Sequence, residues 1–318
     1  GGAESLAMGL FDQLVPEGEL LAGAVQFARQ VLAEGRPLRK VRDADDKLLP
    51  DRGNAALFAN FRAANAKRFR GFLAPEYNIR CIEAAVNSGS FEEGKQVERT
   101  LFLELVSGVQ SQAQRYAFFA ERQAQKIADV PADTPTVPVA SVGIIGAGTM
   151  GGGIAMNFAN AGLPVILVET SQAALDKGLA VVRRNYENSA KRGKFTTAQV
   201  EQRMGLLTGA LDLQALAGCD LVIEAVFENM AIKKEIFAKL DAIVKPGAVL
   251  ATNTSALNVN EIASATSRPE AVVGMHFFSP ANVMKLLEVV RGDKTSKPVV
   301  ATAMQIGKKI GKVAALSG

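Results

Sequence analysis

Apolar residues between positions 20 and 129 recur at steps of three and four, which is the spacing of one helix face. The pattern predicts a helix over 20–31 that ends at Gly35, a second helix around 58–66 and a third that begins at Pro75. We therefore expect the N-terminal part of the chain to be helical.

The longest pattern of this kind runs from Val97 to Asp129. A continuous helix over this range would be about 50 Å long at about 1.5 Å per residue. Gly108 lies inside the pattern, and a proline-rich stretch over 131–138 follows it. A long helix followed by such a stretch is typical of a spacer that joins two modules.

From Val139 onward, short apolar runs alternate with helical patterns, as in βαβ units. Apolar and polar residues do not alternate within these runs, which favours strands buried on both faces of a parallel sheet. The predicted fold class is α/β: a Rossmann-type, doubly wound, mostly parallel sheet preceded by an all-helical segment. Strands are expected over 141–145, 165–169, 221–225, 249–252, 272–277 and 286–290, and helices over 150–161, 173–192, 230–244 and 296–311.

Composition and charge exclude several classes of function. The chain has 318 residues, 48% of them apolar, and a net charge of only +4. Acidic and basic residues are mixed over most of it, so no nucleic-acid partner is indicated, and no apolar run is long enough to span a membrane. Two distant cysteines favour a reducing compartment. Because His276 is the single histidine, a site built from two imidazoles is excluded, and we predict no metal.

A glycine-rich motif follows the first predicted strand and opens a helix, which is the context that a phosphate-binding loop needs. Gly146 would form the tight turn, Gly148 would let the backbone approach a pyrophosphate, and Gly151 would let the helix pack on the strand. The helix N-terminus adds free N–H groups and a partial positive charge. The predicted phosphate loop consists of Gly146, Gly148, Thr149, Met150 and Gly151.

A carboxylate stands at the end of the second predicted strand, eighteen residues beyond Gly151. Glu169 at this position can accept hydrogen bonds from both ribose hydroxyls of an adenosine, and it would repel a 2′-phosphate. The sequence therefore predicts NAD as the cofactor, in preference to NADP.

His276 lies at the end of a predicted strand, where ligands meet an open parallel sheet. Twelve residues later, Glu288 lies inside the next apolar run, and a carboxylate there is costly unless it has a partner. The two could form a general base whose tautomer is held by a carboxylate. The spacing alone also fits a core histidine without a catalytic role.

Five stretches together resemble the NAD-binding domain of the L-3-hydroxyacyl-CoA dehydrogenases of fatty-acid β-oxidation. They include the glycine motif, Asn-Thr-Ser-Ala-Leu, His-Phe-Phe-Ser-Pro and Met-Lys-Leu-Leu-Glu-Val-Val, in the order and spacing of the family. The stretches are 146–155, 220–229, 253–257, 276–280 and 284–290.

The resemblance implies a role for each matching residue. His276 would take the proton from the 3-hydroxyl of an acyl-CoA substrate, and Glu288 would orient the imidazole. Ser255 and Asn253 would position the substrate oxygen and the nicotinamide, while the hydride passes from C3 to NAD and leaves a 3-ketoacyl-CoA. Further cofactor contacts implied by the family are Ala225, Glu228, Lys233 and, again, Asn253.

The N-terminal third resembles other parts of the multifunctional β-oxidation enzymes. Residues 3–15 are similar to the closing segment of a crotonase-type enoyl-CoA hydratase domain, and residues 114–124 to the linker helix of the peroxisomal type. We expect a hydratase tail over 1–36, a helical linker over 37–138 and the NAD-binding domain over 139–318. The hydratase core and a C-terminal helical domain of the parent chain would lie outside this sequence, so we expect NAD binding but poor turnover.

Two alternative functions stay open. A Rossmann dehydrogenase of a small 3-hydroxy acid would usually use a lysine as base, and the His276 and Glu288 pair argues against it. A non-catalytic NAD-binding scaffold would not need Asn253 and Ser255 beside that pair. For localisation, we expect a cytoplasmic, bacterial-type protein, with the peroxisome as the alternative.

Overall fold

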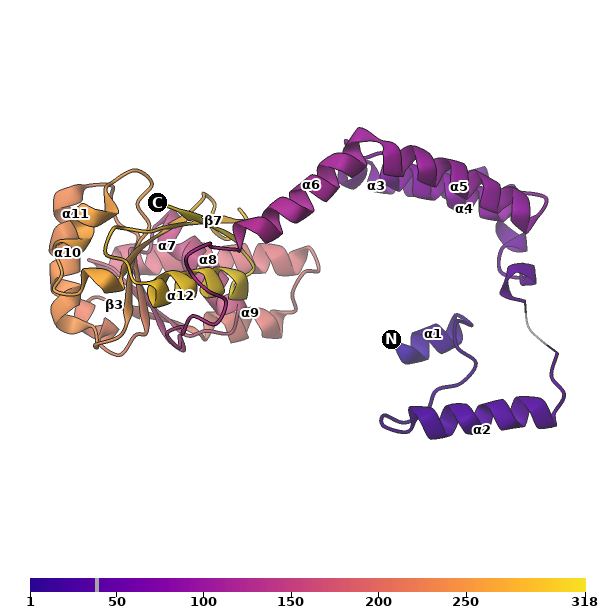
Figure 1. Ribbon diagram of the computed structural model, residues 1–318, viewed down its shortest axis with the longest axis horizontal. Coiled ribbons are helices and arrows are strands. Elements are labelled where there is room, and N and C mark those ends of the chain that lie inside the picture. Colours follow the sequence, from indigo (N-terminus) through magenta and orange to yellow (C-terminus); the bar gives the residue numbers. More distant parts are fainter. Residues whose placement is uncertain (38–39) are drawn as a thin grey trace. The chain divides into compact units, whose positions relative to one another are not determined.

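The computed structural model describes residues 1–37 and 40–318, which form two compact units, 1–114 and 115–318. Figure 1 labels many of the helices and two of the strands in these units. The predicted division into 1–36, 37–138 and 139–318 is finer than this one and stays a prediction.

Unit 1 is helical, as predicted. Phe58, Ile79 and Val86 form its small core, with 5–6% of each residue exposed. The limits predicted at Gly35 and Pro75 are confirmed. The helix Leu20–Ala33 ends before Gly35, and the helix Ala74–Asn87 has Pro75 in its first turn. The helices are α1 (Gly2–Ala7), α2 (Leu20–Ala33), α3 (Ala55–Phe69), α4 (Ala74–Asn87), α5 (Phe91–Ser107) and the start of α6 (Val109–Ala124), with short 3-10 turns at Val41–Asp43 and Leu49–Asp51.

The prediction of one continuous helix from Val97 to Asp129 is wrong. The segment contains two helices, α5 and α6, and the second already ends at Ala124. The break lies at Gly108, whose backbone is extended with φ −72° and ψ 158°. Glycine favours such a break because it loses more conformational freedom in a helix than any other residue.

Unit 2 contains one eight-stranded sheet in the order β3-β2-β1-β4-β5-β6-β7-β8. All neighbouring strands are parallel except β6 and β7, which are antiparallel. The six predicted strands are confirmed to within one residue at each end, and β3 and β8 are additional. The strands are β1 (Val142–Ile145), β2 (Val165–Val168), β3 (Leu207–Ala210), β4 (Leu221–Glu224), β5 (Val249–Thr252), β6 (Val272–Phe277), β7 (Leu286–Val290) and β8 (Val313–Ser317).

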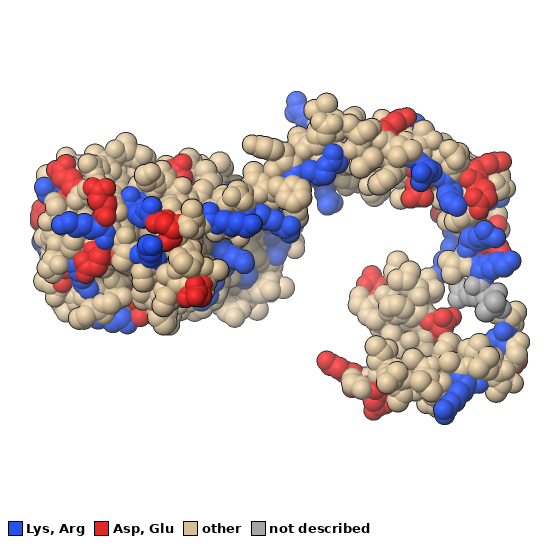
Figure 2. Space-filling model, in the orientation of Figure 1, with Lys and Arg blue, Asp and Glu red and all other residues tan. Residues whose placement is uncertain are grey.

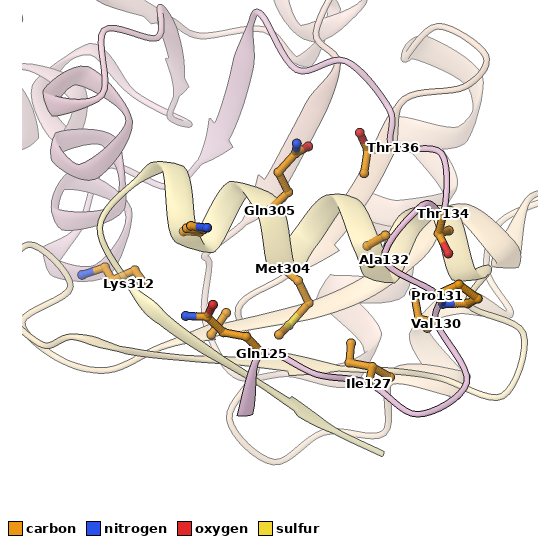
Figure 3. A pocket seen from close by; sticks show the side chains of 13 residues that line it. Gln125, Ile127, Val130, Pro131, Ala132, Thr134, Thr136, Met304, Gln305 and Lys312 are labelled. Atoms are coloured by element: carbon orange, nitrogen blue, oxygen red, sulfur yellow. The ribbon is translucent and has the colours of Figure 1, made fainter. Parts of the chain in front are cut away.

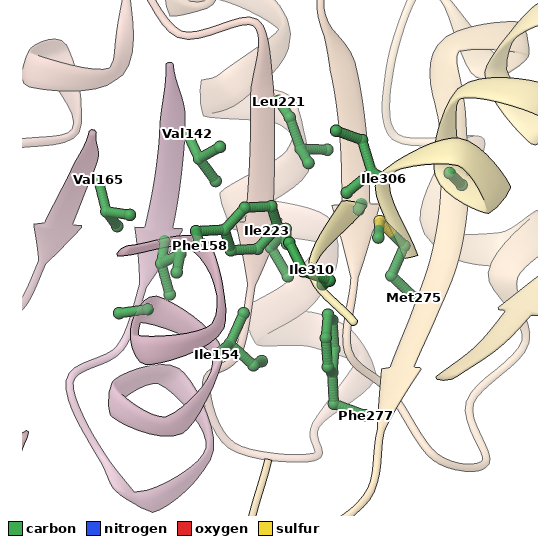
Figure 4. Close-up of a cluster of buried hydrophobic side chains, with 14 of the residues drawn as sticks. Val142, Ile154, Phe158, Val165, Leu221, Ile223, Met275, Phe277, Ile306 and Ile310 are labelled. Carbon is green, nitrogen blue, oxygen red and sulfur yellow. The ribbon is translucent and has the colours of Figure 1, made fainter. Parts of the chain in front are cut away.

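Helices cover both faces of this sheet, so the doubly wound Rossmann-type fold is confirmed (Figure 1). Figure 4 shows one buried cluster, in which Ile223 of the sheet packs with Phe158 and Ile306 from two helices. The adjacent Val222 packs in the opposite cluster, against Phe237, because successive strand residues point to opposite faces. The helices are α7 (Thr149–Asn160), α8 (Gln172–Lys191), α9 (Thr197–Met204), α10 (Met230–Ile243), α11 (Val259–Ala263) and α12 (Lys297–Lys309), with 3-10 turns at Leu213–Leu216 and Pro269–Ala271.

A partly buried carboxylate, Asp220, links the start of β1 to the start of β4. Asp220 Oδ2 accepts the amide N–H groups of Ala140 and Ser141, each at 2.9 Å. Burial alone would raise the pKa of the Asp220 carboxyl, but Lys245 and these N–H donors lower it to about 2. The neighbouring strands β1 and β4 are therefore joined at the sheet edge opposite their carboxyl ends.

Basic and acidic side chains are mixed over unit 2 on the face that Figure 2 shows. Among the helices that the structure describes, none combines the length and the apolar character needed to cross a bilayer. In the same residues, no group of three His, Cys, Asp or Glu side chains is placed to hold a metal ion.

Candidate active site

The glycine loop connects the end of β1 to the start of α7 and needs its glycines at two positions for steric reasons. Gly146 has a φ of +100°, and a Cβ there would lie 2.8 Å from the carbonyl oxygen of Ala225. A Cβ on Gly151 would lie 1.8 Å from the carbonyl oxygen of Gly146. The loop therefore packs so closely on itself and on the end of β4 that side chains are excluded.

Gly148 differs from these two glycines, because a Cβ there would meet nothing within 4 Å. Its missing side chain leaves open space directly at the N-terminus of α7, where free amide N–H groups favour an anion. Thr149 is the first residue of α7. Met150 is partly buried and packs against the hydrophobic cluster that contains Ile223 and Phe158. The loop thus has the form of a phosphate cradle.

Glu169 follows β2 and lies against this loop. Its Oε1 accepts the amide N–H of Ala147 at 2.9 Å, and its Oε2 accepts that of Thr170 at 2.9 Å. Glu169, Ala147, Gly148 and Thr149 line one cavity of about 340 Å³, together with residues of α8. The structure therefore brings Glu169, which is predicted to bind the ribose, next to the predicted phosphate loop. This arrangement fits a dinucleotide.

His276 and Glu288 are direct cross-strand neighbours in the antiparallel pair β6 and β7. The His276 Nδ1 and Glu288 Oε2 atoms lie 2.7 Å apart. The imidazole is mostly buried, with 17% of the side chain exposed, whereas the Glu288 side chain is 39% exposed. This contact leaves the other ring nitrogen, Nε2, free to exchange a proton with a ligand.

Asn253 links the loop after β5 to the strand that carries the histidine. Its Oδ1 accepts the amide N–H of Phe277, the residue after His276, at 2.9 Å. The Asn253 NH₂ group remains available as a hydrogen-bond donor at the carboxyl edge of the sheet, next to β6, which carries His276.

Glu228 holds the loop that contains Ser255. Its Oε1 accepts from the Thr254 hydroxyl at 2.6 Å, from the Ser255 amide at 2.8 Å and hydroxyl at 3.2 Å, and from the Ala256 amide at 3.3 Å. Partial burial alone would raise the pKa of the Glu228 carboxyl, but these donors and the Lys233 ammonium lower it to about 2. The carboxylate is therefore ionised near neutral pH.

Lys233 lies below this loop and is only 1% exposed. Its Nζ is 2.7 Å from Glu224 Oε1 and 3.4 Å from Glu228 Oε2. Glu224, the last residue of β4, is fully buried and was not among the predicted site residues. A charge at the end of the apolar run Leu-Val-Ile-Glu is the signal that could have identified it.

A second cavity, of about 320 Å³, lies between segment 125–136 and α12, with Lys312 at one end (Figure 3). None of the predicted site residues lines it. The Lys312 Nζ donates to the carbonyl oxygens of Ala281 and Met284, at 2.5 and 2.6 Å. Burial lowers the pKa of this ammonium group. Lys312 therefore fastens the loop between β6 and β7, just beyond the histidine.

Comparison with known proteins gives a consistent result. Residues 141–317 match the family described as "3-hydroxyacyl-CoA dehydrogenase, NAD binding domain". The chain is 41% identical over 320 residues to the peroxisomal bifunctional enzyme of Cavia porcellus, an alignment that covers 99% of this chain and 43% of that protein. The chain thus spans less than half the length of this curated relative.

Two solved structures are similar to unit 2. The 3-hydroxybutyryl-CoA dehydrogenase of Escherichia coli is 39% identical, with a TM-score of 0.56, over 56% of this chain and 38% of that chain. The dehydrogenase part of multifunctional enzyme 1 of C. elegans is 33% identical, with a TM-score of 0.56, over 62% of this chain and 48% of that chain.

Proposed function

We propose, since the chain belongs to the family of 3-hydroxyacyl-CoA dehydrogenases, that it oxidises L-3-hydroxyacyl-CoA thioesters to 3-ketoacyl-CoA with NAD. The observation that supports this most directly is the 2.7 Å contact between His276 and Glu288 at the carboxyl edge of the sheet. That edge also carries the glycine loop and Asn253, so a proton acceptor and a dinucleotide cradle share one side of the domain.

In the proposed reaction, His276 Nε2 accepts the proton of the substrate 3-hydroxyl. Glu288 keeps the Nδ1 proton in place and stabilises the imidazolium that forms. Bound NAD would supply the hydride acceptor, so that the alcohol would lose the hydroxyl proton to His276 and a hydride from C3 and become a ketone. Ser255 and Asn253 hold the substrate oxygen and the nicotinamide side of the site.

The cofactor contacts are proposed along the same edge. Gly146, Gly148, Thr149, Met150 and Gly151 form the pyrophosphate cradle, in which backbone N–H groups are the donors. The carboxylate of Glu169 accepts from the adenosine ribose. The remaining proposed members, toward the nicotinamide, are Ala225, Glu228, Lys233 and Asn253.

We further propose that the chain is part of a bifunctional hydratase and dehydrogenase of fatty-acid β-oxidation. The relative from Cavia porcellus is named a peroxisomal bifunctional enzyme, and the alignment covers the helical unit as well as the dehydrogenase domain. The same name supports the peroxisomal alternative for localisation in preference to the cytoplasmic prediction.

Single-turnover reduction tests the activity. The 318-residue chain, in excess over NADH, is mixed with acetoacetyl-CoA or with free acetoacetate, and NADH loss is followed. We expect slow turnover with the thioester and none with the free acid, and loss of this slow turnover in His276→Ala while NADH affinity is kept. Turnover of the free acid alone would favour a small-acid dehydrogenase, and NADH binding without turnover of either compound would favour a scaffold.

A further inference from the structure

The loop 278–285 connects β6 to β7 and lies between the two halves of the candidate site. At its start, the Phe278 ring lies against the His276 imidazole, with ring centroids 4.5 Å apart and ring planes inclined by 44°. Farther along, Pro280 and Asn282 line the cavity of about 340 Å³ that contains the phosphate loop. A displacement of this loop would therefore change the surroundings of the proposed base and of the proposed cradle together.

Lys312 holds this loop from the turn between α12 and β8. The residue is only 8% exposed, and its Nζ donates to the carbonyl oxygens of Ala281 and Met284, at 2.5 and 2.6 Å. In the described part of the chain, these partners are carbonyl oxygens and not carboxylates. A buried ammonium group without an opposite charge is costly, and an apolar side chain would fill the same space without this cost. The two contacts to the loop are therefore what distinguishes Lys312 from a residue that only fills the core.

Asn157 of α7 holds the same loop from a second side. This residue is 4% exposed, and its Nδ2 donates to the Ala281 carbonyl oxygen at 3.0 Å. The backbone of α7 approaches the loop closely, since a Cβ on Gly153 would lie 3.1 Å from the Ala281 Cβ and 3.3 Å from the Asn282 amide nitrogen. The Ala281 carbonyl thus has two donors, and one of them remains when the other is removed.

We propose that Lys312 and Asn157 are positioning residues, which act through the loop 278–285 and keep Phe278 against the His276 imidazole. This inference rests on the proposed function, in which His276 exchanges a proton with the substrate. The contact with Glu288 fixes Nδ1 of the imidazole, but it leaves the ring free to tilt about this contact. Because Phe278 lies against the ring, it restricts the tilt and so the direction in which Nε2 points.

NMR of the imidazole gives a test that does not depend on activity. His276 is the single histidine of the chain, so isotope-labelled histidine gives one ring signal for each position. An aromatic ring 4.5 Å away shifts these signals through its ring current. We expect Phe278→Leu to move the His276 signal, and Lys312→Met to move it in the same direction. The matched control is Lys309→Met, which should leave the signal in place, because Lys309 is exposed at the end of α12.

A double variant separates the loop from a direct effect of the lost charge. In Lys312→Met combined with Phe278→Leu, the His276 signal should coincide with that of Phe278→Leu alone, since the ring that Lys312 helps to place is absent. If Lys312→Met does not fold, Asn157→Leu removes the other donor to Ala281 and is measured in its place, with the same expectation.

Kinetics then show what the loop contributes to the reaction. We expect Lys312→Met to slow single-turnover reduction of acetoacetyl-CoA by about 10- to 100-fold at saturating NADH and thioester, because a displacement of about 1 Å in an active site can cost about 100-fold. Combined with Phe278→Leu, the loss should be no larger than that of the more impaired single variant. Lys309→Met should react like the unmodified chain.

A His276 signal that is unchanged in Lys312→Met, or losses that multiply in the double variant, would overturn the positioning role. Failure of the unmodified chain to reduce acetoacetyl-CoA would instead refute the proposed function. The NMR signal would then still decide whether Lys312 keeps Phe278 against the imidazole, so the two failures are distinguishable.

Discussion

Replacing Glu288 with Gln tests how far the carboxylate assists proton removal by His276. Gln has the same size and can still accept from Nδ1, but it carries no charge when the imidazole becomes a cation. Two unit charges about 4 Å apart attract by about 4 kcal/mol at an effective dielectric constant of about 20. Because the Glu288 side chain is 39% exposed, solvent screening leaves roughly half of this attraction.

About 2 kcal/mol corresponds to a loss of roughly 30-fold in the rate of the chemical step. The Gln amide can also turn its NH₂ toward Nδ1, which would place the ring proton on Nε2 and block the base. We therefore expect Glu288→Gln to slow single-turnover oxidation of an L-3-hydroxyacyl-CoA by NAD by at least roughly 30-fold, with NAD affinity unchanged.

The control for this prediction is Glu261→Gln, which removes a carboxylate that is 50% exposed and pairs only with Lys234 in the described ion pairs. It should react at the rate of the unmodified chain. A rate within threefold of the unmodified chain for Glu288→Gln itself would show that the carboxylate does not stabilise a developing imidazolium, and the supporting role proposed for Glu288 would have to be abandoned.

The other three predictions concern two glycines of the phosphate loop and Asp220, which links β1 to β4. Gly148→Ala should lower NADH affinity by about tenfold or more without changing the melting temperature, because its methyl group occupies only the open space of the cradle. Gly151→Ala should instead destabilise the fold by about 1–3 kcal/mol or more, measured by urea unfolding. Asp220→Asn should lose about 2 kcal/mol near neutral pH, since the folded pKa is about 2 against an unfolded value of about 3.9. This stabilisation is present above the unfolded pKa and is lost as the pH falls through the folded one, so Asp220→Asn should flatten the dependence of the unfolding free energy on pH between about 4 and 2. A steep dependence retained in Asp220→Asn would assign the acid sensitivity to other carboxylates.

The sequence predicted the central strands well because their burial leaves a clear pattern. The run over 221–225 is almost entirely apolar, as expected for a strand covered by helices on both faces. β3 and β8 lie at the two sheet edges and are partly exposed, so their residues carry a weaker signal. α11 has only five residues, too few to show a helical period.

The candidate site could also be predicted from the sequence only in part. Pairing of His276 with Glu288 could be predicted because both lie in successive apolar runs, where an uncompensated charge is costly. The chain of Glu224, Lys233 and Glu228 could not, because its members belong to a strand end, a helix and the loop between them. Their proximity depends on the angle at which α10 leaves the sheet, and no local sequence pattern encodes that angle.

The two halves of the site are held by different means, and this has consequences for their rigidity. The reversal of β7 sets Glu288 directly opposite His276, where Cβ atoms of an antiparallel pair are about 4.5–5.5 Å apart, so the strand ladder itself fixes the base. Ser255 lies on an exposed loop beyond β5 and has no ladder. Its place depends on side chains, above all on Glu228. Within the residues that the structure describes, the loop has one side-chain hydrogen bond to the histidine strand, from the Phe277 N–H to Asn253 Oδ1. The substrate-facing loop is therefore the part of the site in which a single lost charge can move a reacting group while the base stays where it is.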